Sequence, residues 1–587
     1  MMDIKNAIVR QAASYDAVAF DVFDTLLKRD VDKPTDLFRL AGEEFAQKRI
    51  QAEQLARATA QQEVTLAKIY EQPALSGADP SRECALEVLA AVPNLPVLEA
   101  VRKLHAQGKR IYFISDMYLP PEQIHTMLLR CGYDMMEGGF VSCSFGVQKR
   151  SGGLFRRFLR ETGLKARQVL FIGDSWRADV LGAALAGVRA WHLPAPDPVP
   201  GCVQSRDFLS GAVRAFVQNR LSGMPYGGRA LGFSVLGPLE VAFCQWIHQR
   251  RQEQGNARVF FLARDMYLTR IVYALMYPGE KTEYLQISRR SLCPALLAKR
   301  QYELLVYALP RQVLSGAQIA AYCGTTCPKA WTEKRFDLKA VQPGEIPESL
   351  KELLAVLQAP QDALLVLGYL KNSGLKDGDI LVDIGSGGTT QMLLEALCGI
   401  RLNGLQLSGD ARLRARLSQE RAKVFLSLAQ EEARLYWAGQ PMLERMISQD
   451  VGATAGYHRC GETITVQREK AIVEPVIAEL QQGALAFARA WGKSVLAELL
   501  IGPDLAIEPF LQMVRTPDRT QLELLGDLSV EDGGIYPLAA PRPCRWYVAH
   551  PKMLKKDLSE ARWKIGFLAR LFPVHLPYDR LYLALKK

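Results

Sequence analysis

Two aspartates at the end of one apolar segment are the side chains in this chain best suited to chemistry. Asp21 and Asp24 follow the apolar run 17–20, which predicts a buried β-strand. Two carboxylates at a strand end can share the work of phosphoryl transfer. One attacks phosphorus and helps to hold Mg²⁺, and the other handles the proton of the leaving group. A single pair of this kind also occurs as an ordinary strand-end cap, so the interpretation depends on the residues that follow.

Three later segments supply the other groups that such a site needs. Ser115 ends a second apolar run, and its hydroxyl suits contact with a phosphate oxygen. Lys149 offers a fixed positive charge for the phosphoryl transition state. Asp174 and Asp179 follow a third apolar run. Asp174 suits direct ligation of Mg²⁺, which prefers hard oxygen ligands, and Asp179 suits support of the loop or of the metal's waters.

These four motifs resemble the four signatures of the haloacid dehalogenase (HAD) superfamily. By position, the resemblance implies that Asp21 is the nucleophile that forms an aspartyl-phosphate. It also implies that Asp24 protonates the leaving alkoxide and then activates water, and that Ser115 and Lys149 bind the phosphoryl group. The phosphatases of the superfamily have an acid at the position of Asp24 and the dehalogenases lack it, so we expect hydrolysis of a phosphate monoester. The implied Mg²⁺ ligands are Asp21, the backbone carbonyl of Asp24, and Asp174, with Asp179 behind them.

Such a site requires a sheet that brings several strand ends together. The apolar runs 17–20, 111–114 and 169–172 alternate with helical stretches, which predicts a doubly wound parallel α/β sheet with functional residues at the carboxyl ends of its strands. A helical segment between the first two motifs corresponds, by the resemblance, to a cap over the active site. Alternating prolines in 193–201 favour an extended linker. We therefore expect a HAD-like phosphatase domain at 1–200 with a helical cap at about 34–100, a second α/β, phosphoribosyltransferase-like domain at 205–545, and a basic amphipathic helical tail at 546–587.

Composition places the chain among ordinary globular proteins. It has 587 residues, of which 49% are apolar and 23% are charged. This length is too great for a single core, so two or three domains are expected. The start of the sequence lacks the apolar region of a signal peptide, no apolar run approaches 18 residues, and the eleven cysteines form no repeating framework. These features favour a cytoplasmic protein without a membrane span.

The second domain has two strand-end motifs of its own. Arg264 and Asp265 follow the apolar run 259–262, and Asp383 follows the run 380–382. After Asp383 comes a loop of small residues and then a helical pattern. Such a loop presents backbone N–H groups to an anion, and Asp383 can accept hydrogen bonds from ribose hydroxyls. The loop residues are Gly385, Ser386, Gly387, Gly388, Thr389 and Thr390.

Several kinds of protein use a loop of this type. Methyltransferases that use S-adenosylmethionine place it at the first strand of their domain, whereas here an earlier strand with a polar tip precedes it. Actin-like ATPases also use it, but the sequence contains no second copy. Phosphoribosyltransferases have an early loop that contacts pyrophosphate and a late loop that cradles phosphate, which is the order seen here. Glycines that only turn the chain are a further alternative.

The whole chain resembles two-domain bacterial polysaccharide-biosynthesis proteins that couple a HAD phosphatase to a glycan phosphoribosyltransferase. The motifs that carry this resemblance lie at 232–238, 262–265, 287–290 and 382–385. One position departs from the pattern. Phosphoribosyltransferases commonly show two adjacent acids at the ribose position, whereas here Ile384 follows Asp383.

This resemblance implies that ribofuranose is installed in two steps. The second domain would transfer 5-phosphoribose from phosphoribosyl pyrophosphate (PRPP) to a lipid-linked acceptor glycan, and the HAD domain would then remove the 5-phosphate. Arg264, Arg289 and Arg290 are candidates for pyrophosphate contact, because guanidinium groups suit phosphate oxygens; a solvated surface pair is the alternative for the last two. Asp265 suits the acceptor base, a metal ligand or a helix cap. The other functions to weigh are a HAD phosphatase with a non-catalytic glycan- or partner-binding module, and one with an appended methyltransferase.

The net charge of +11 is partly concentrated at the carboxyl end. From His550 onward, nine Lys or Arg residues face three Asp or Glu residues, with aromatic residues such as Trp563 and Phe567 among them. This composition is typical of a helix that contacts an anionic membrane surface from the cytoplasmic side. A solvated helix packed on its own domain is the alternative. Nucleic acid is not an expected partner, because no recognised binding module accompanies the charge.

Overall fold

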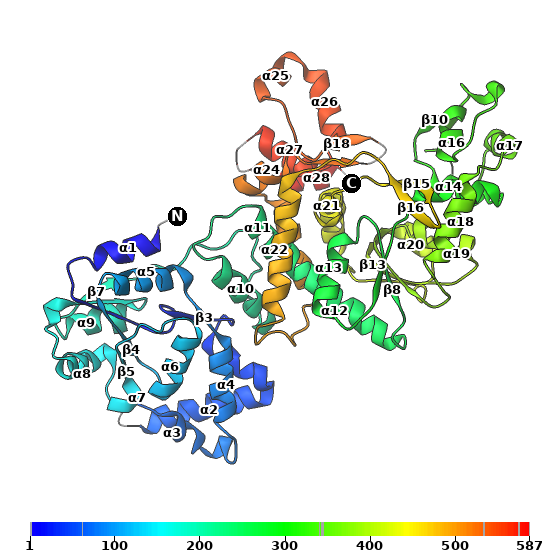
Figure 1. Ribbon diagram of the computed structural model, residues 1–587. Coiled ribbons are helices and arrows are strands. Elements are labelled where there is room, and N and C mark those ends of the chain that lie inside the picture. The colour runs from blue at the N-terminus through cyan, green and yellow to red at the C-terminus, as the bar shows by residue number, and fades with distance from the viewer. Residues whose placement is uncertain are drawn as a thin grey trace. The chain divides into compact units, whose positions relative to one another are not determined.

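The computed structural model describes residues 3–60, 63–339, 341, 345–531, 534–572, 574 and 576–585 (Figure 1). The chain forms two compact units. The first comprises Met1–Tyr226 and Ala490–Leu499, and the second comprises Gly227–Arg489 and Leu500–Lys587. The first unit therefore extends past the proline-rich segment at which the sequence analysis placed the boundary.

The first unit contains the expected doubly wound parallel sheet. Its five strands lie in the order β5-β4-β1-β6-β7, and every neighbouring pair is parallel. The central strand β1 is buried along its whole length, as its apolar sequence predicts. Because the carboxyl ends of parallel strands meet at one edge, residues that follow β1, β4 and β6 converge there. The strands are β1 (Ala17–Phe20), β4 (Arg110–Ser115), β5 (Gly138–Val141), β6 (Val169–Gly173) and β7 (Arg189–His192).

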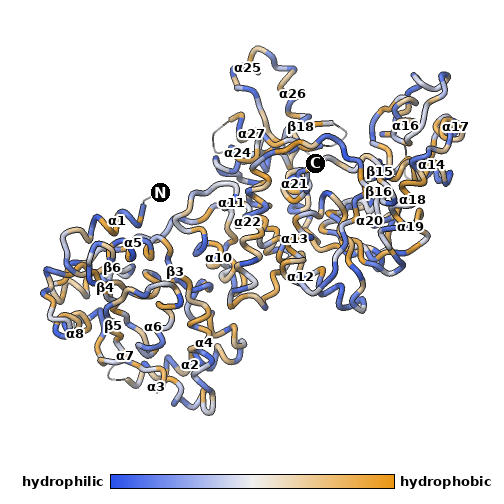
Figure 2. Tube along the Cα trace, in the orientation of Figure 1, coloured by the Kyte–Doolittle hydropathy of each residue, from blue (hydrophilic) through white to orange (hydrophobic). Residues whose placement is uncertain are grey.

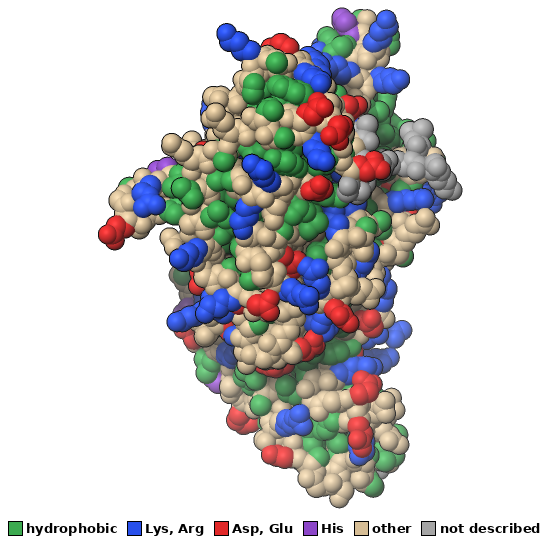
Figure 3. All heavy atoms as spheres, turned by 90° about the vertical axis from the view of Figure 1, so that its right-hand side faces the viewer, with side chains coloured by type: hydrophobic (Ala, Val, Ile, Leu, Met, Phe, Trp, Pro, Cys, Tyr) green, Lys and Arg blue, Asp and Glu red, His purple; other side chains and the backbone are tan. Residues whose placement is uncertain are grey.

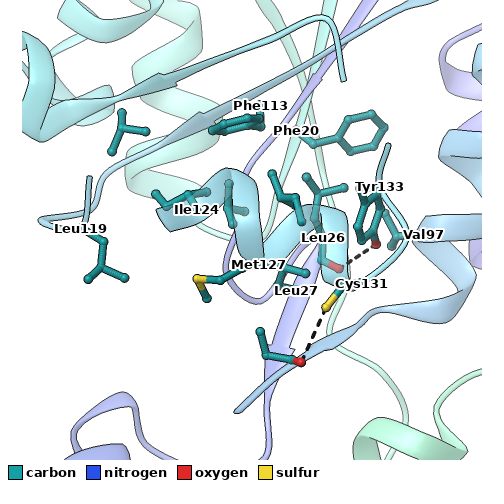
Figure 4. Packing of buried hydrophobic residues seen from close by; sticks show 14 of the residues in the cluster. Phe20, Leu26, Leu27, Val97, Phe113, Leu119, Ile124, Met127, Cys131 and Tyr133 are labelled. Atoms are coloured by element: carbon teal, nitrogen blue, oxygen red, sulfur yellow. Dashed lines mark hydrogen bonds between the residues drawn. The ribbon is translucent and has the colours of Figure 1, made fainter. Parts of the chain in front are cut away.

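Alternate residues of β1 serve two hydrophobic cores, one on each face of this sheet. Val18 and Phe20 pack with α5 (Leu95–Ala106) and α6 (Pro121–Arg130), and Figure 4 shows Phe20 beside Phe113, with Ile124 of α6 in the same core. The opposite core packs against α8 (Gly153–Thr162). Tyr133 is buried in the first core, and its hydroxyl donates to the backbone carbonyl of Leu26 at 2.7 Å.

The segment between the first two motifs is helical, as expected for a cap. Its main elements are α2 (Glu43–Thr59), α3 (Leu66–Tyr70) and α4 (Ser81–Ala90). Arg49 is buried in this segment and donates to the carboxylate of Glu83 at 2.5 and 2.8 Å. The paired charges avoid the large cost of an isolated buried ion.

Helix α10 (Phe208–Leu221) belongs to the first unit although it follows the prolines. Arg220 donates to both carboxylate oxygens of the buried Asp30 at 2.7 and 2.8 Å. Asn219 donates to the carbonyl of Arg29 at 2.7 Å. Phe216 packs edge-on against Trp491, with 5.1 Å between ring centroids. These contacts are the reason that the first compact unit ends at Tyr226.

The second unit also has a five-stranded parallel sheet, as predicted. Its order is β14-β13-β12-β8-β9. The chain therefore starts at β8, moves outward to the edge strand β9, and then returns to the other side of β8 at β12. Sheets of this kind have a crevice outside the carboxyl ends of the strands at the point of reversal, here between β8 and β12. The strands are β8 (Val259–Leu262), β9 (Thr282–Leu285), β12 (Ile380–Ser386), β13 (Asn403–Gly409) and β14 (Ala422–Val424).

A long apolar helical stretch, Gly228–Glu253, ends in α12 (Gly237–Glu253) of the second unit. Within the part of the chain that the structure describes, it is the one stretch long and apolar enough to cross a membrane, and 94% of its apolar window is buried inside the protein. In Figure 2 the tube changes along α12 from hydrophobic to hydrophilic, because the last residues of the helix are polar. Burial of this kind is typical of a core helix.

The carboxyl-terminal region is helical, as predicted, and part of it contributes to the core of the second unit. Trp563 and Phe567 are buried. On the face seen in Figure 3, Lys and Arg side chains are interspersed with Asp and Glu, and no single basic patch covers that face. The helices of this region are α25 (Cys544–Ala549), α26 (Pro551–Glu560), α27 (Lys564–Leu571) and α28 (Tyr578–Leu585).

Candidate functional site

Three carboxylates converge at the carboxyl edge of the first sheet. Asp21 follows β1, and Asp174 and Asp179 follow the neighbouring strand β6. The backbone N–H of Asp21 donates to the carbonyl of Ile172 at 2.8 Å, which fixes the start of this loop against β6. One oxygen from each of the three carboxylates lies within 4.8 Å of the others. The structure thus brings together three of the residues that the sequence analysis assigned to metal binding.

Lys149 lies among these carboxylates and is 3% exposed. Its Nζ atom donates to Asp21 at 2.6 Å and to Asp179 at 2.7 Å. Its backbone N–H donates to the carboxylate of Asp116 at 2.8 and 3.1 Å. Asp116 therefore positions the lysine, a role that the sequence analysis did not assign. The signal for it was an acid directly after Ser115, the last residue of β4.

Burial and mutual charge shape the protonation of this cluster. The pKa of Asp21 is raised to about 7, mainly by burial; Lys149 opposes this rise, and the charge of Asp179 adds to it. Burial, followed by the charge of Asp24, raises the pKa of Asp174. Burial alone would favour neutral Lys149, but the charges of Asp21 and Asp179 outweigh it and raise the pKa of the lysine. The site is therefore an acidic cluster held by one buried ammonium group.

Asp24 is exposed and does not belong to this cluster. Its φ angle of +59° is in the left-handed region, which aspartate tolerates better than most residues. Its side chain is 61% exposed, and Lys28 Nζ lies 3.5 Å from its carboxylate. Lys28 also donates to the backbone carbonyl of Asp24 at 2.7 Å, the atom that the resemblance assigns to Mg²⁺. The two acids of the first motif thus face different surroundings, one buried and one open to solvent.

Two hydroxyl groups complete the surroundings of the cluster. Thr25 Oγ1 donates to Asp174 at 3.4 Å. Ser115 is 1% exposed at the end of β4, the strand that pairs with β1. The donor set of Asp21, Asp174 and Asp179 consists of hard carboxylate oxygens, so it fits a magnesium ion better than a soft metal.

The second sheet gathers a different acidic group near the neighbouring strands β8 and β12. Asp265 follows β8 and accepts a hydrogen bond from Ser448 at 3.1 Å. Burial raises the pKa of Asp383 to about 7, with the charge of Asp265 as the next cause. Burial raises the pKa of Glu444 to about 8, again with Asp265 as the next cause. The three carboxyl groups therefore interact electrostatically within one site.

The sequence analysis did not identify Glu444. This residue lies on α21 (Gln430–Ile447), far along the chain from β8 and β12, and no local motif marks it. Its carboxylate accepts a hydrogen bond from Gln440, one turn earlier, at 2.9 Å. Only the three-dimensional structure shows that its carboxyl group interacts electrostatically with those of Asp265 and Asp383.

The three predicted arginines differ in their placement. Arg264 donates to Glu531 at 2.6 Å and to the carbonyl of Val451 at 3.2 Å, and its Nε lies 4.0 Å from Asp265. Arg289 begins α14 (Arg289–Ala298), and its charge offsets part of the rise that burial causes in the pKa values of Asp265 and Asp383. Arg290 forms an ion pair with Glu469 and is 43% exposed. Arg264 and Arg289 thus interact electrostatically with the acidic residues near β8 and β12, whereas Arg290 pairs with Glu469.

The small-residue loop runs into α19 (Thr389–Cys398), with Gly388 at the helix N-cap and Thr390 in the first turn. Gly385 and Gly388 have φ angles of +93° and +64°. A Cβ atom on Gly385 would collide with the carbonyl of Ser408, so packing against β13 already requires glycine there. The sequence analysis did not name the nearby Arg416, which donates to the carbonyl of Gly387 at 2.8 Å and to Thr389 Oγ1 at 2.7 Å.

Comparison with known proteins identifies the family of the segment that carries the first site. Residues 15–187 match the model for haloacid dehalogenase-like hydrolases, so this segment is a HAD-like hydrolase domain. Similar solved structures include a HAD phosphatase from Thermococcus onnurineus, with 16% identity, 30% of this chain and 86% of that chain covered, and a TM-score of 0.26. A HAD family enzyme from Bacteroides thetaiotaomicron shows 17% identity, 31% and 96% coverage, and a TM-score of 0.26. No curated protein matches the chain.

Proposed function

We propose that the first unit is a Mg²⁺-dependent phosphomonoesterase. The observation that carries this proposal is the buried Lys149, which bridges Asp21 and Asp179 beside Asp174 while Asp24 faces outward. A nucleophile has to be held near a positive charge that offsets the charge of the phosphoryl group. A general acid instead has to reach the leaving group, so the two carboxyl groups must lie in different surroundings.

The reaction then proceeds in two displacement steps. Asp21 attacks phosphorus, an oxygen–phosphorus bond to the aspartate forms, and the ester bond breaks while Asp24 gives its proton to the leaving alkoxide. Asp24 then takes a proton from water, whose oxygen attacks phosphorus and releases phosphate and free Asp21. Lys149 and Ser115 contact the phosphoryl oxygens. Asp21, Asp174 and Asp179 would hold Mg²⁺, which when bound supplies further neutralisation of the phosphoryl charge.

Phosphate release by the full chain tests this proposal. We expect hydrolysis of a phosphate monoester that depends on Mg²⁺ and stops when EDTA is added. Asp174→Ala should weaken Mg²⁺ dependence and activity together. Asp134→Asn is the matched control, because Asp134 is exposed and lies outside the site. Hydrolysis that proceeds unchanged in EDTA would contradict the assignment of a metal-dependent site.

We further propose that the second unit transfers 5-phosphoribose from PRPP to an acceptor glycan, and that the first unit then removes the 5-phosphate. Support comes from the acidic group at the reversal point of a parallel sheet, with Arg264 and Arg289 beside it. Burial and neighbouring guanidinium groups also lower the pKa of Arg416 at the glycine loop, which indicates a positive potential suited to phosphate. A non-catalytic glycan-binding module is the competing function for this unit.

Mass spectrometry of the acceptor separates these two functions. With PRPP, Mg²⁺ and synthetic acceptor glycans, Asp21→Asn protein should accumulate a phosphoribosyl product that wild-type protein converts to a ribosyl product. Asp383→Ala should stop the first step and spare hydrolysis by the first unit. If no PRPP binding and no transfer occur with any acceptor, the second unit is a binding module.

We also propose that the carboxyl-terminal helices contact an anionic membrane that carries the lipid-linked acceptor. Val548 is 81% exposed on α25, and α26 carries Lys552, Lys555 and Lys556. Exposed apolar and basic side chains together favour binding to anionic lipid. Co-sedimentation with vesicles that contain phosphatidylserine, but not with neutral vesicles, is the expected result.

A further inference from the structure

A polar pocket in the first unit adjoins Asp24 and has no assigned role. Its volume is about 140 Å³. Asp24 and Lys28 contribute from the first motif, Asn94 from the start of α5, and Asn219 and Ser222 from α10 and its end. Pockets for drug-sized ligands occupy roughly 300–1,000 Å³. This pocket therefore has room for one small chemical unit, and the rest of a longer molecule would lie outside it.

The position of the pocket relates it to the leaving group. Asp24 is the proposed acid, so the oxygen that it protonates has to lie against its carboxylate. Asp21, the proposed nucleophile, is not among the residues that line the pocket. The pocket therefore lies on the side of the reaction centre from which the alcohol departs.

The charges around the pocket are already paired. Lys28 lies 3.5 Å from the Asp24 carboxylate, and Arg29 donates to Glu87 at 2.8 Å. Arg214 of α10 forms an ion pair with Asp32. A charged leaving group, such as a nucleotide, would need a cation free to pair with it. An uncharged leaving group fits the pocket better, because it needs no free cation.

The remaining polar groups suit hydroxyl groups. Amide side chains both donate and accept hydrogen bonds, as hydroxyl groups do. Asn94 Nδ2 donates to the carbonyl of Thr25 at 2.9 Å, and Asn219 Nδ2 donates to the carbonyl of Arg29. These bonds fix both amides, and each amide oxygen can still accept a hydrogen bond. Ser222 adds a hydroxyl group at the rim.

Contacts between α10 and the proline-rich segment hold this wall in place. Gln218 lines the pocket, accepts from the N–H of Val199 at 2.9 Å, and donates to the carbonyl of Asp197 at 2.9 Å. Pro196 lines the pocket beside them. The segment expected to be a linker thus contributes Pro196 to the pocket lining.

We propose that this pocket is the leaving-group subsite of the phosphatase and takes an uncharged, polyhydroxylated alcohol the size of one sugar unit. The inference rests on the proposed phosphatase function. It assigns substrate selection to α10 and the proline-rich segment, in addition to any contribution from the helical cap. Nothing in the HAD signatures marks these residues.

Steady-state kinetics of the full chain with two substrates tests the subsite. Ribose 5-phosphate has a sugar leaving group, and acetyl phosphate has a small one that does not need the pocket. Ser222→Tyr should fill the rim and raise KM for ribose 5-phosphate by about 10-fold or more, the range expected for the loss of a fitted contact, with little change for acetyl phosphate. Met224→Tyr is the matched control, because Met224 is exposed and does not line the pocket.

Each outcome distinguishes the subsite from the activity itself. If wild-type protein hydrolyses neither substrate, the proposed phosphatase function fails. If it hydrolyses both, and Ser222→Tyr changes neither or changes both equally, the subsite is wrong. An independent measurement is hydrogen–deuterium exchange of Asp21→Asn protein. Ribose 5-phosphate should slow exchange in 194–200 and 208–222 more than inorganic phosphate does, and equal protection would overturn the proposal.

Discussion

The ion pair between Arg220 and Asp30 gives the sharpest prediction about the extent of the first unit. Both carboxylate oxygens of Asp30 accept from Arg220, and the Asp30 side chain is 1% exposed. Arg220→Ala would leave this carboxylate buried without its partner and would remove the guanidinium group from the Phe216 ring, whose centroid lies 3.5 Å away. Removal of one partner from a buried pair costs about 3–5 kcal/mol. Because the Arg220 side chain is 22% exposed, we take the lower value, about 3 kcal/mol.

Hydrogen–deuterium exchange measures this effect in the unit concerned. A loss of about 3 kcal/mol corresponds to an increase of roughly 150-fold in the population of open states. Peptides that cover β2 (Leu27–Arg29) and α10 should exchange faster by about that factor, whereas peptides that cover β12 provide an internal control and should not change. Asp30→Asn should restore much of the protection in the double variant. If exchange in α10 stays within about threefold of the wild type, α10 is not an integral part of the unit.

Three further predictions concern Lys149, Glu444 and the carboxyl end of the first unit. Lys149→Met should lower kcat for phosphate release by about 10²–10³-fold, because it removes the charge that faces the phosphoryl group; a loss below about fivefold would contradict that role. The pKa of Glu444, about 8, lies above that of an exposed glutamate, so its stabilising contribution is complete at low pH and is lost as the pH rises through 8. Glu444→Gln should therefore raise the melting temperature relative to wild type at pH 9 but not at pH 5, and an equal change at both would refute this. A chain that ends at residue 200 should be less soluble and less active than one that ends at 226, because it lacks α10, and equal behaviour would contradict the observed boundary.

The convergence of Asp21, Asp174 and Asp179 could be anticipated from the sequence because these residues follow strand ends. Each of Asp21, Asp174 and Lys149 stands next to an apolar run or in a recognisable motif, and parallel pairing of β1 with β6 brings the two strand ends together. The same reasoning located Asp265 after β8 and Asp383 on the neighbouring strand β12, which continues past it to Ser386. What it could not locate were side chains that depend on long-range packing.

Three features illustrate this limit. Glu444 joins the second site from a helix, and no spacing rule connects it to β8 or β12. Asp116 accepts from the backbone N–H of Lys149, and although its place after Ser115 marks it as a candidate, the sequence does not show this contact. The prolines of 193–201 suggested a linker, but Gln218 binds the backbone of this segment to α10. Proline fixes backbone geometry and does not determine what the segment packs against.

Detection of a phosphorylated Asp21 tests the central claim most directly. Wild-type protein would be mixed with acetyl phosphate and Mg²⁺, quenched in acid, and analysed by mass spectrometry of its peptides. We predict the added mass of one phosphoryl group on the peptide that contains Asp21, and no such addition in Asp21→Asn protein, which should also lose activity by a factor of order 10³ or more. Phosphate release without any adduct on Asp21, and with more than about a tenth of the activity kept by Asp21→Asn, would contradict the account.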